Sequence, residues 1–133
     1  MTRSEQASKV LVENAKANRE NIKFVIDIDG IGNAPGYPAS RSVLLTHNTS
    51  IIQEIVGICV AHTNLTFQTA HGGGGSDFSV FATQDFMGME FHETTSSGFV
   101  HSAQDVIGTI NLEYCTEVAK AACAVLLKID ATF

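Results

Sequence analysis

The sequence predicts an α/β domain in which a mainly parallel sheet lies between two layers of helices. Short apolar segments typical of strands alternate with segments whose apolar residues recur at helical spacing, and this alternation is typical of parallel sheets. The run 22–28 is apolar almost throughout, which indicates a strand buried on both faces. We therefore expect one three-layer domain over residues 1–133.

Capping boxes mark the first two expected helices. In each, Ser or Thr is followed three residues later by Glu or Gln, as in Thr2 with Glu5 and Ser50 with Gln53. The polar residues 18–21 should end the first helix. The elements expected in this half are a helix before residue 18, strands at 22–28 and 42–46, and a helix from residue 50 to about His62.

The last helix is the clearest element in the C-terminal half. Asn111 is a good N-cap, and the residues that follow form one apolar stripe. The stripe consists of Tyr114, Val118, Ala121, Ala122, Val125, Leu126 and Ile129. Upstream of this helix, the sequence predicts strands at 65–68 and 87–91, a glycine loop at 72–75 and a polar loop at 92–98.

The composition argues against several classes of partner. The chain has 8 Lys and Arg against 14 Asp and Glu, a net charge of −6, so it lacks the basic surface that binds nucleic acid or an anionic membrane. Its apolar runs are too short to cross a bilayer, and its first residues lack the apolar stretch of a signal peptide. We expect a soluble chain, and its location stays open.

Two carboxylates lie at the end of the most apolar strand. Asp29 follows the run 22–28 directly, and Asp27 points to the same side of the strand. In open α/β sheets, ligands bind beyond the carboxyl ends of strands. Asp29 is therefore a candidate binding residue, although a strand-terminal Asp often only caps its own loop.

The glycine run 72–75 does not match the common catalytic loops. A serine hydrolase would need a G-x-S-x-G elbow, and a phosphate loop would need Gly-Lys-Ser/Thr after the glycines; the sequence has neither. We expect Ser76 or Asp77 to cap a short helix. His92-Glu93 begins like a zincin motif, but Ser96 stands where the second His should be.

His101 is the most interesting imidazole in the sequence. It lies in a loop after an expected strand, and Asp105 follows four residues later. Imidazole and carboxylate are natural zinc ligands, and a second carboxylate can orient the ring through its other nitrogen. A lone loop histidine is, however, most often a surface residue.

Together, three segments resemble the C-terminal half of the co-catalytic di-zinc aminopeptidases, which include bacterial leucyl aminopeptidases and glutamate carboxypeptidase II-like enzymes. Residues 26–32 (IDIDGIG) resemble the family's strand end I-N-L-D-M-I-G. Residues 75–81 (GSDFSVF) resemble its turn G-S-D-H-x-P-F, and residues 100–106 (VHSAQDV) resemble Y-H-T-x-x-D-T. The resemblance covers nearly the whole chain and preserves the order of the three motifs.

The resemblance implies a zinc site. By matching the motifs, Asp29 would hold one zinc ion and His101 the other, with Asp27, Asp77 and Asp105 in supporting positions. In the family, the first His, the bridging Asp and a Glu-Glu pair come before this segment, so the sequence implies a zinc-peptidase fold that is incomplete. Val100 and Phe78 also replace a Tyr and a His of the family motifs.

Two functions follow from the resemblance. The first is a portion of a zinc exopeptidase that acts on a peptide or an amino-acid-like substrate and is inactive as this chain alone, because a catalytic zinc needs three protein ligands. The alternative is a non-catalytic binding or assembly module on the same scaffold. Because an incomplete sheet exposes an edge, we expect a homo-oligomer or completion by an N-terminal half.

Overall fold

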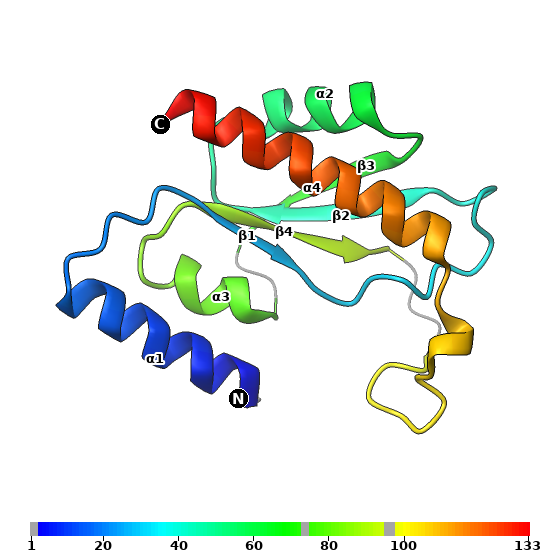
Figure 1. Ribbon diagram of the computed structural model, residues 1–133, viewed down its shortest axis with the longest axis horizontal. Helices are drawn as coiled ribbons and strands as arrows, with labels where there is room; N and C mark the ends of the chain where they lie inside the picture. Colours follow the sequence, from blue (N-terminus) through cyan, green and yellow to red (C-terminus); the bar gives the residue numbers. More distant parts are fainter. Residues whose placement is uncertain (1–2, 73–74, 95–97) are drawn as a thin grey trace.

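The computed structural model describes residues 3–72, 75–94 and 98–133 of the chain. Helices and strands alternate along it, as the sequence predicts (Figure 1). In chain order the elements are α1 (Arg3–Ala17), β1 (Val25–Ile28), β2 (Ser42–His47), α2 (Ile52–His62), β3 (Thr66–His71), α3 (Asp77–Ala82), β4 (Gly88–Glu93), the 3-10 helix η1 (Ile107–Thr109) and α4 (Leu112–Thr132).

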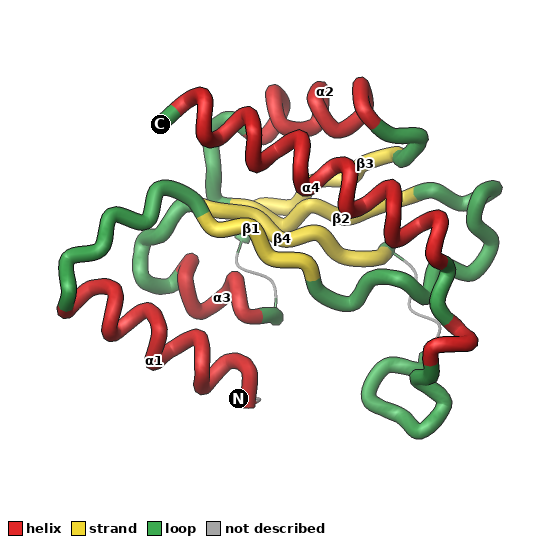
Figure 2. The backbone as a smooth tube through the Cα atoms, in the orientation of Figure 1, coloured by secondary structure: helices red, strands yellow, loops and turns green. Residues whose placement is uncertain are grey.

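The four strands form one sheet in the order β1-β4-β2-β3. The pairs β1–β4 and β2–β3 are parallel, whereas β2 and β4 are antiparallel. The sheet is therefore mixed, and parallel pairing predominates as expected. Helices α2 and α4 cover one face and α1 and α3 lie on the other (Figures 1 and 2), which confirms the three-layer prediction.

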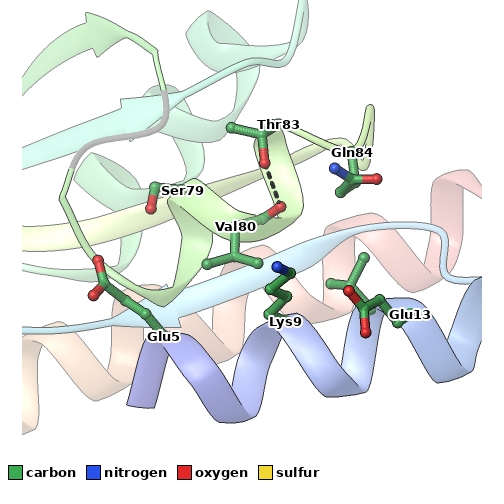
Figure 3. A pocket seen from close by; sticks show the side chains of 8 residues that line it. Glu5, Lys9, Glu13, Ser79, Val80, Thr83 and Gln84 are labelled. Atoms are coloured by element: carbon green, nitrogen blue, oxygen red, sulfur yellow. Dashed lines mark hydrogen bonds between the residues drawn. The ribbon is translucent and has the colours of Figure 1, made fainter. Parts of the chain in front are cut away.

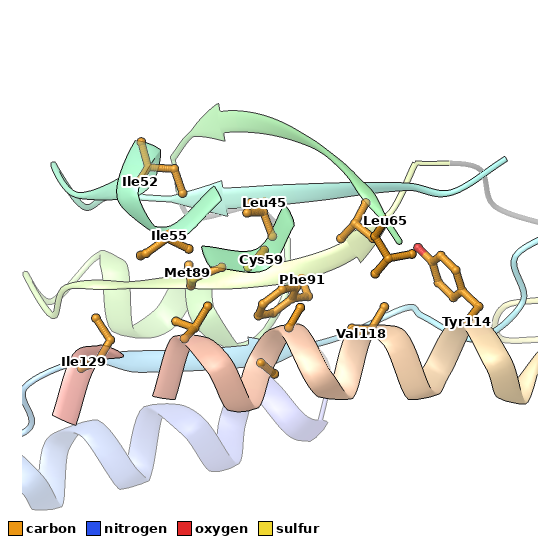
Figure 4. Packing of buried hydrophobic residues seen from close by; sticks show 14 residues of the cluster. Leu45, Ile52, Ile55, Cys59, Leu65, Met89, Phe91, Tyr114, Val118 and Ile129 are labelled. Atoms are coloured by element: carbon orange, nitrogen blue, oxygen red, sulfur yellow. The ribbon is translucent and has the colours of Figure 1, made fainter. Parts of the chain in front are cut away.

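The larger core lies between the sheet and the α2–α4 layer. Leu45, Met89 and Phe91 project from the strands toward the apolar stripe of α4, and Ile55 of α2 packs beside them (Figure 4). A smaller core under α1 and α3 contains Val12, Phe78 and Phe81. Burial of these side chains is the main stabilising contribution to the fold.

The prediction that β1 is buried on both faces is wrong. Its side chains are only partly buried, and Ile28 is 45% exposed. The reason is position: β1 lies at the edge of the described sheet and pairs only with β4. The strand also begins at Val25 rather than at residue 22.

The helix caps follow the sequence only in part. The side chain of Asn111 accepts a hydrogen bond from the Tyr114 N–H at 3.1 Å and caps α4 as expected. The Ser50 capping box is wrong, because Ile51 is the N-cap of α2 and makes no side-chain cap bond. Thr2 lies outside the described residues. None of the helices described has the length and apolar character needed to cross a bilayer.

Candidate metal centre

Asp29 occupies the position that the sequence predicts, directly after the last residue of β1. Its backbone is held by β4: the Asp29 N–H donates to the Phe91 carbonyl oxygen at 3.1 Å, and His92 Nδ1 lies 2.9 Å from the Asp29 carbonyl oxygen. The residue itself is exposed. Its main chain is therefore fixed while its carboxylate faces solvent, as a ligand-binding group requires.

Asp27 connects the end of β1 to the turn at residues 75–78. Its Oδ2 accepts a hydrogen bond from the Phe78 N–H, at the start of α3, at 2.9 Å. Ser76 is the N-cap of α3 but makes no side-chain cap bond. The carboxylate that caps the start of this helix is instead that of Asp27, on β1. Asp77 begins the helix, and its buried Oδ1 has no hydrogen-bond partner among the residues described.

His101 and Asp105 lie in an exposed loop before η1. His101 has a positive φ of 61°, a conformation that is uncommon for residues other than glycine. The Asp105 N–H donates to the Ser102 carbonyl oxygen at 3.1 Å. Figure 1 shows this loop, in yellow, beyond the end of the sheet toward which β1 and β4 run.

The described residues do not contain a complete metal site. No group of three or more His, Cys, Asp or Glu side chains within residues 3–72, 75–94 and 98–133 is arranged to hold a metal ion. The assignments of Asp29 and His101 as zinc ligands, and of Asp27, Asp77 and Asp105 as supporting residues, therefore remain predictions.

Two residues on β4 beside Asp29 were not predicted from the sequence as site residues. A cavity of about 310 Å³ is lined by Asp29, Glu90 and His92 together with Leu44, Thr46 and Gly75. Glu90 is only 4% exposed, and His92 Nδ1 lies 3.7 Å from its Oε1. The available signal was the alternation of Glu90 and His92 with apolar residues, which places both on one side of a strand.

Glu90 is held in an unfavourable environment for a charge. Burial raises the pKa of its carboxyl group, and the nearby carboxylates of Asp27 and Asp29 raise it further. The Ser76 hydroxyl and His92 act in the opposite direction and lower the pKa. A buried acid beside a predicted ligand is a common feature of functional sites.

Glu93 fixes the loop that follows Asp29. It is 7% exposed, and its Oε1 accepts a hydrogen bond from the Asn33 N–H at 2.5 Å. Burial raises the pKa of Glu93, while the N–H groups of Asn33 and Gly32 lower it. The predicted loop from residue 92 is thus wrong at its start, because His92 and Glu93 belong to β4.

Another cavity, of about 450 Å³, lies between α1 and α3, away from these residues (Figure 3). Lys9 and Glu13 of α1 and Val80 and Thr83 of α3 are among its lining residues, and the Thr83 hydroxyl donates to the Val80 carbonyl oxygen at 2.8 Å. None of the predicted site residues lines it. The cavity beside Asp29 is smaller, but it is the one that the predicted site residues define.

Comparison with known proteins decides the family. The model of peptidase family M28 matches residues 4–126. The chain belongs to peptidase family M28. Peptidases of this family are generally zinc-dependent. No curated protein sequence matches the chain significantly.

Solved structures with the same fold include two proteins of Legionella pneumophila. The LapA aminopeptidase matches with a TM-score of 0.76 and 18% identity over 92% of this chain and 34% of its own. A second LapA structure matches with a TM-score of 0.72 and 19% identity, and the match covers 92% of this chain and 36% of that structure. LapB matches with a TM-score of 0.81 and 16% identity, and the match covers 96% of this chain and 36% of LapB. This M28 chain thus spans about a third of the length of these structures.

Proposed function

We propose that this chain is the part of an M28 zinc peptidase domain that supplies Asp29 and His101 as zinc ligands. The completed domain would remove N-terminal residues from peptides or hydrolyse amino-acid-like amides. The observation that carries the proposal is the position of Asp29: an exposed carboxylate on a fixed backbone at the carboxyl end of β1, in a chain that matches the M28 family.

The donor types suit zinc, but their number does not. Carboxylate oxygen and imidazole nitrogen are common zinc ligands, and a catalytic zinc needs three protein ligands and an open position. The described residues offer no such group. We therefore assign no catalytic step to this chain by itself, and its inactivity in isolation is part of the proposal.

The test is a chimera of the LapA aminopeptidase in which the region matched by this chain is replaced by residues 1–133. The isolated chain should not hydrolyse leucine p-nitroanilide, whereas the chimera should. Asp29→Asn and His101→Ala should each lower kcat/KM of the chimera by more than about 100-fold, because loss of a direct ligand should exceed the 10–100-fold cost of losing a group that orients one.

Matched controls are Asp130→Asn on α4 and His62→Ala at the end of α2, both exposed and outside the predicted site. They should leave kcat/KM within about twofold of the parent chimera, since surface changes away from a site have small effects. A folded chimera without activity would instead favour a non-catalytic binding or assembly module. Hydrolysis by the isolated chain would contradict the proposal that this chain supplies only some of the zinc ligands.

A further inference from the structure

Two histidines lie side by side at the carboxyl ends of β2 and β3. His47 and His71 are the last residues of these parallel strands, and the register pairs them directly. Their ring centroids are 5.6 Å apart, and the ring planes meet at 82°. Neither residue belongs to the predicted zinc centre. The pair is therefore a separate cluster of imidazoles on the sheet.

The histidine pair lies on the other face of the sheet from Glu90 and His92. His47 pairs with Met89 of β4, and the Met89 side chain lies in the core under α2 and α4 (Figure 4). His47 therefore faces that layer. Successive residues of a strand face opposite sides, so Glu90 and His92 point the other way, into the cavity that contains Asp29. The two groups of side chains are distinct sites.

The ring of His47 is oriented by the backbone. Its Nδ1 lies 3.1 Å from the Thr49 carbonyl oxygen, and because a carbonyl oxygen only accepts, Nδ1 carries the proton. In the neutral ring, Nε2 then keeps its lone pair. Metal-binding histidines are usually oriented in this way, by a hydrogen bond from the other ring nitrogen to a carbonyl oxygen or a carboxylate.

His47 is also suited to stay neutral. Burial lowers the pKa of its imidazole, and His71 lowers it further, although the hydrogen bond to Thr49 acts in the opposite direction. A neutral ring is the form that binds a metal ion. His71 is exposed, so the pair lies at the surface, and the His71 ring can turn without disturbing the core.

The separation of the rings favours a tetrahedral metal ion. An ion bound to one ring nitrogen of each histidine at about 2.0–2.1 Å lies about 3.2 Å from each ring centroid. With the centroids 5.6 Å apart, the angle between the two bonds at the ion is about 120°. This angle is close to the tetrahedral geometry of zinc, whereas the square-planar geometry of Cu²⁺ would need the rings closer together.

We propose that His47 and His71 form an accessory zinc site in which the ion links the ends of β2 and β3 and water fills its remaining positions. Strand β3 is almost entirely exposed and pairs only with β2 among the strands described. An ion that binds only the folded chain stabilises this edge. A catalytic zinc has three protein ligands, so we assign this ion no catalytic step, and the proposal does not depend on the proposed peptidase function.

NMR of the histidine rings in the ¹⁵N-labelled chain tests the site directly. During a titration with zinc chloride, the Nε2 resonances of His47 and His71 should shift together and give one Kd. The proton on Nδ1 of His47 should remain, because its bond to the Thr49 carbonyl oxygen is compatible with metal at the other nitrogen. A shift of one ring without the other would overturn the proposal.

His71→Ala removes one ligand at an exposed position, so the core should stay intact. It should weaken zinc binding at His47 by at least about 10-fold, since loss of a direct ligand should cost no less than loss of a group that orients one. The matched control is His62→Ala, at the exposed end of α2, which should leave the Kd within about twofold. Asp29→Asn should also leave it within about twofold, because Asp29 lines the other cavity.

Thermal unfolding supplies a second readout. With zinc at about ten times its Kd, the Tm of the parent chain and of His62→Ala should rise by about 4–6 °C, and His71→Ala should lose most of this rise. An equal rise in the parent and in His71→Ala would assign the effect to other groups, such as the exposed Cys123 thiol, and would overturn the proposal. A Kd at the two rings that Asp29→Asn weakens would place the ion at the candidate metal centre and overturn it as well.

Discussion

Replacing Glu93 by alanine should destabilise the loop that follows Asp29. Glu93 is almost fully buried, and its Oε1 accepts a hydrogen bond from the Asn33 N–H. Glu93→Ala leaves this donor without its acceptor. A buried donor left unpaired costs about 1–3 kcal/mol, and Asn33 is partly exposed, so water recovers some of the loss. We expect a decrease in stability of about 2 kcal/mol.

This change should be easy to measure. For a chain of this length about 2 kcal/mol corresponds to a decrease in Tm of roughly 6–10 °C. Urea unfolding at neutral pH should show a lower midpoint with an unchanged m value. Glu93→Gln keeps an acceptor oxygen and should stay within about 1 kcal/mol of the parent.

The control for Glu93 is Glu20→Ala, an exposed position after α1, which should change stability by less than about 0.5 kcal/mol. Hydrogen exchange should localise the effect of Glu93→Ala to the amide of Asn33. If Glu93→Ala unfolds at the same urea concentration as Glu20→Ala, and the Asn33 amide keeps its protection, then Glu93 does not hold the loop and the reasoning is refuted.

Three further predictions concern single side chains. Asp27→Asn weakens the hydrogen bond between the Asp27 carboxylate and the Phe78 N–H, so it should lower the free energy of unfolding by about 1 kcal/mol. Thermal unfolding measures this change, and an unchanged Tm would show that Asp27 does not cap α3. Because burial raises the pKa of Glu90 above 4.5, the metal-free chain should lose stability as pH rises through that raised pKa. Glu90→Gln should therefore be more stable than the parent at pH 7, and this gain in stability should disappear below about pH 4.5. A gain in stability that is equal at both pH values would contradict this prediction. Tyr114→Phe removes the hydroxyl that donates to the Ser42 carbonyl oxygen at 3.0 Å, so it should lower the free energy of unfolding by about 1 kcal/mol. Urea unfolding measures this change, and an unchanged midpoint would argue that the bond does not contribute to stability.

Much of the fold can be predicted from local sequence patterns. Of the seven residues predicted for the stripe of α4, six are buried and Leu126 is 59% exposed. The Asn111 cap and the end of the strand before Asp29 also agree with the structure. These features depend on residues close together in the chain. The pairing of strands is different. Nothing in the spacing of apolar residues indicates that β4 lies between β1 and β2, because pairing is decided by contacts between distant segments.

The candidate site could be predicted only in outline. The strand end at Asp29 has a general physical reason, since loops and strand ends meet there. Glu90 lies in a strand that the sequence predicts, but no local pattern indicates that its carboxylate is buried, and Glu93 falls in a segment whose polar residues predict a loop. The Asn33 N–H, which donates to Glu93, and the groups that shift the pKa of Glu90, such as Asp29, come from segments far away in the sequence.

The most direct test of the central claim is a crystal structure of the LapA chimera grown with zinc, with anomalous data collected at the zinc edge. We expect anomalous peaks about 2.0–2.2 Å from an Asp29 carboxylate oxygen and about 2.0–2.1 Å from a His101 ring nitrogen. Peaks held only by other residues, or a completed domain in which these two side chains bind no zinc, would contradict the claim.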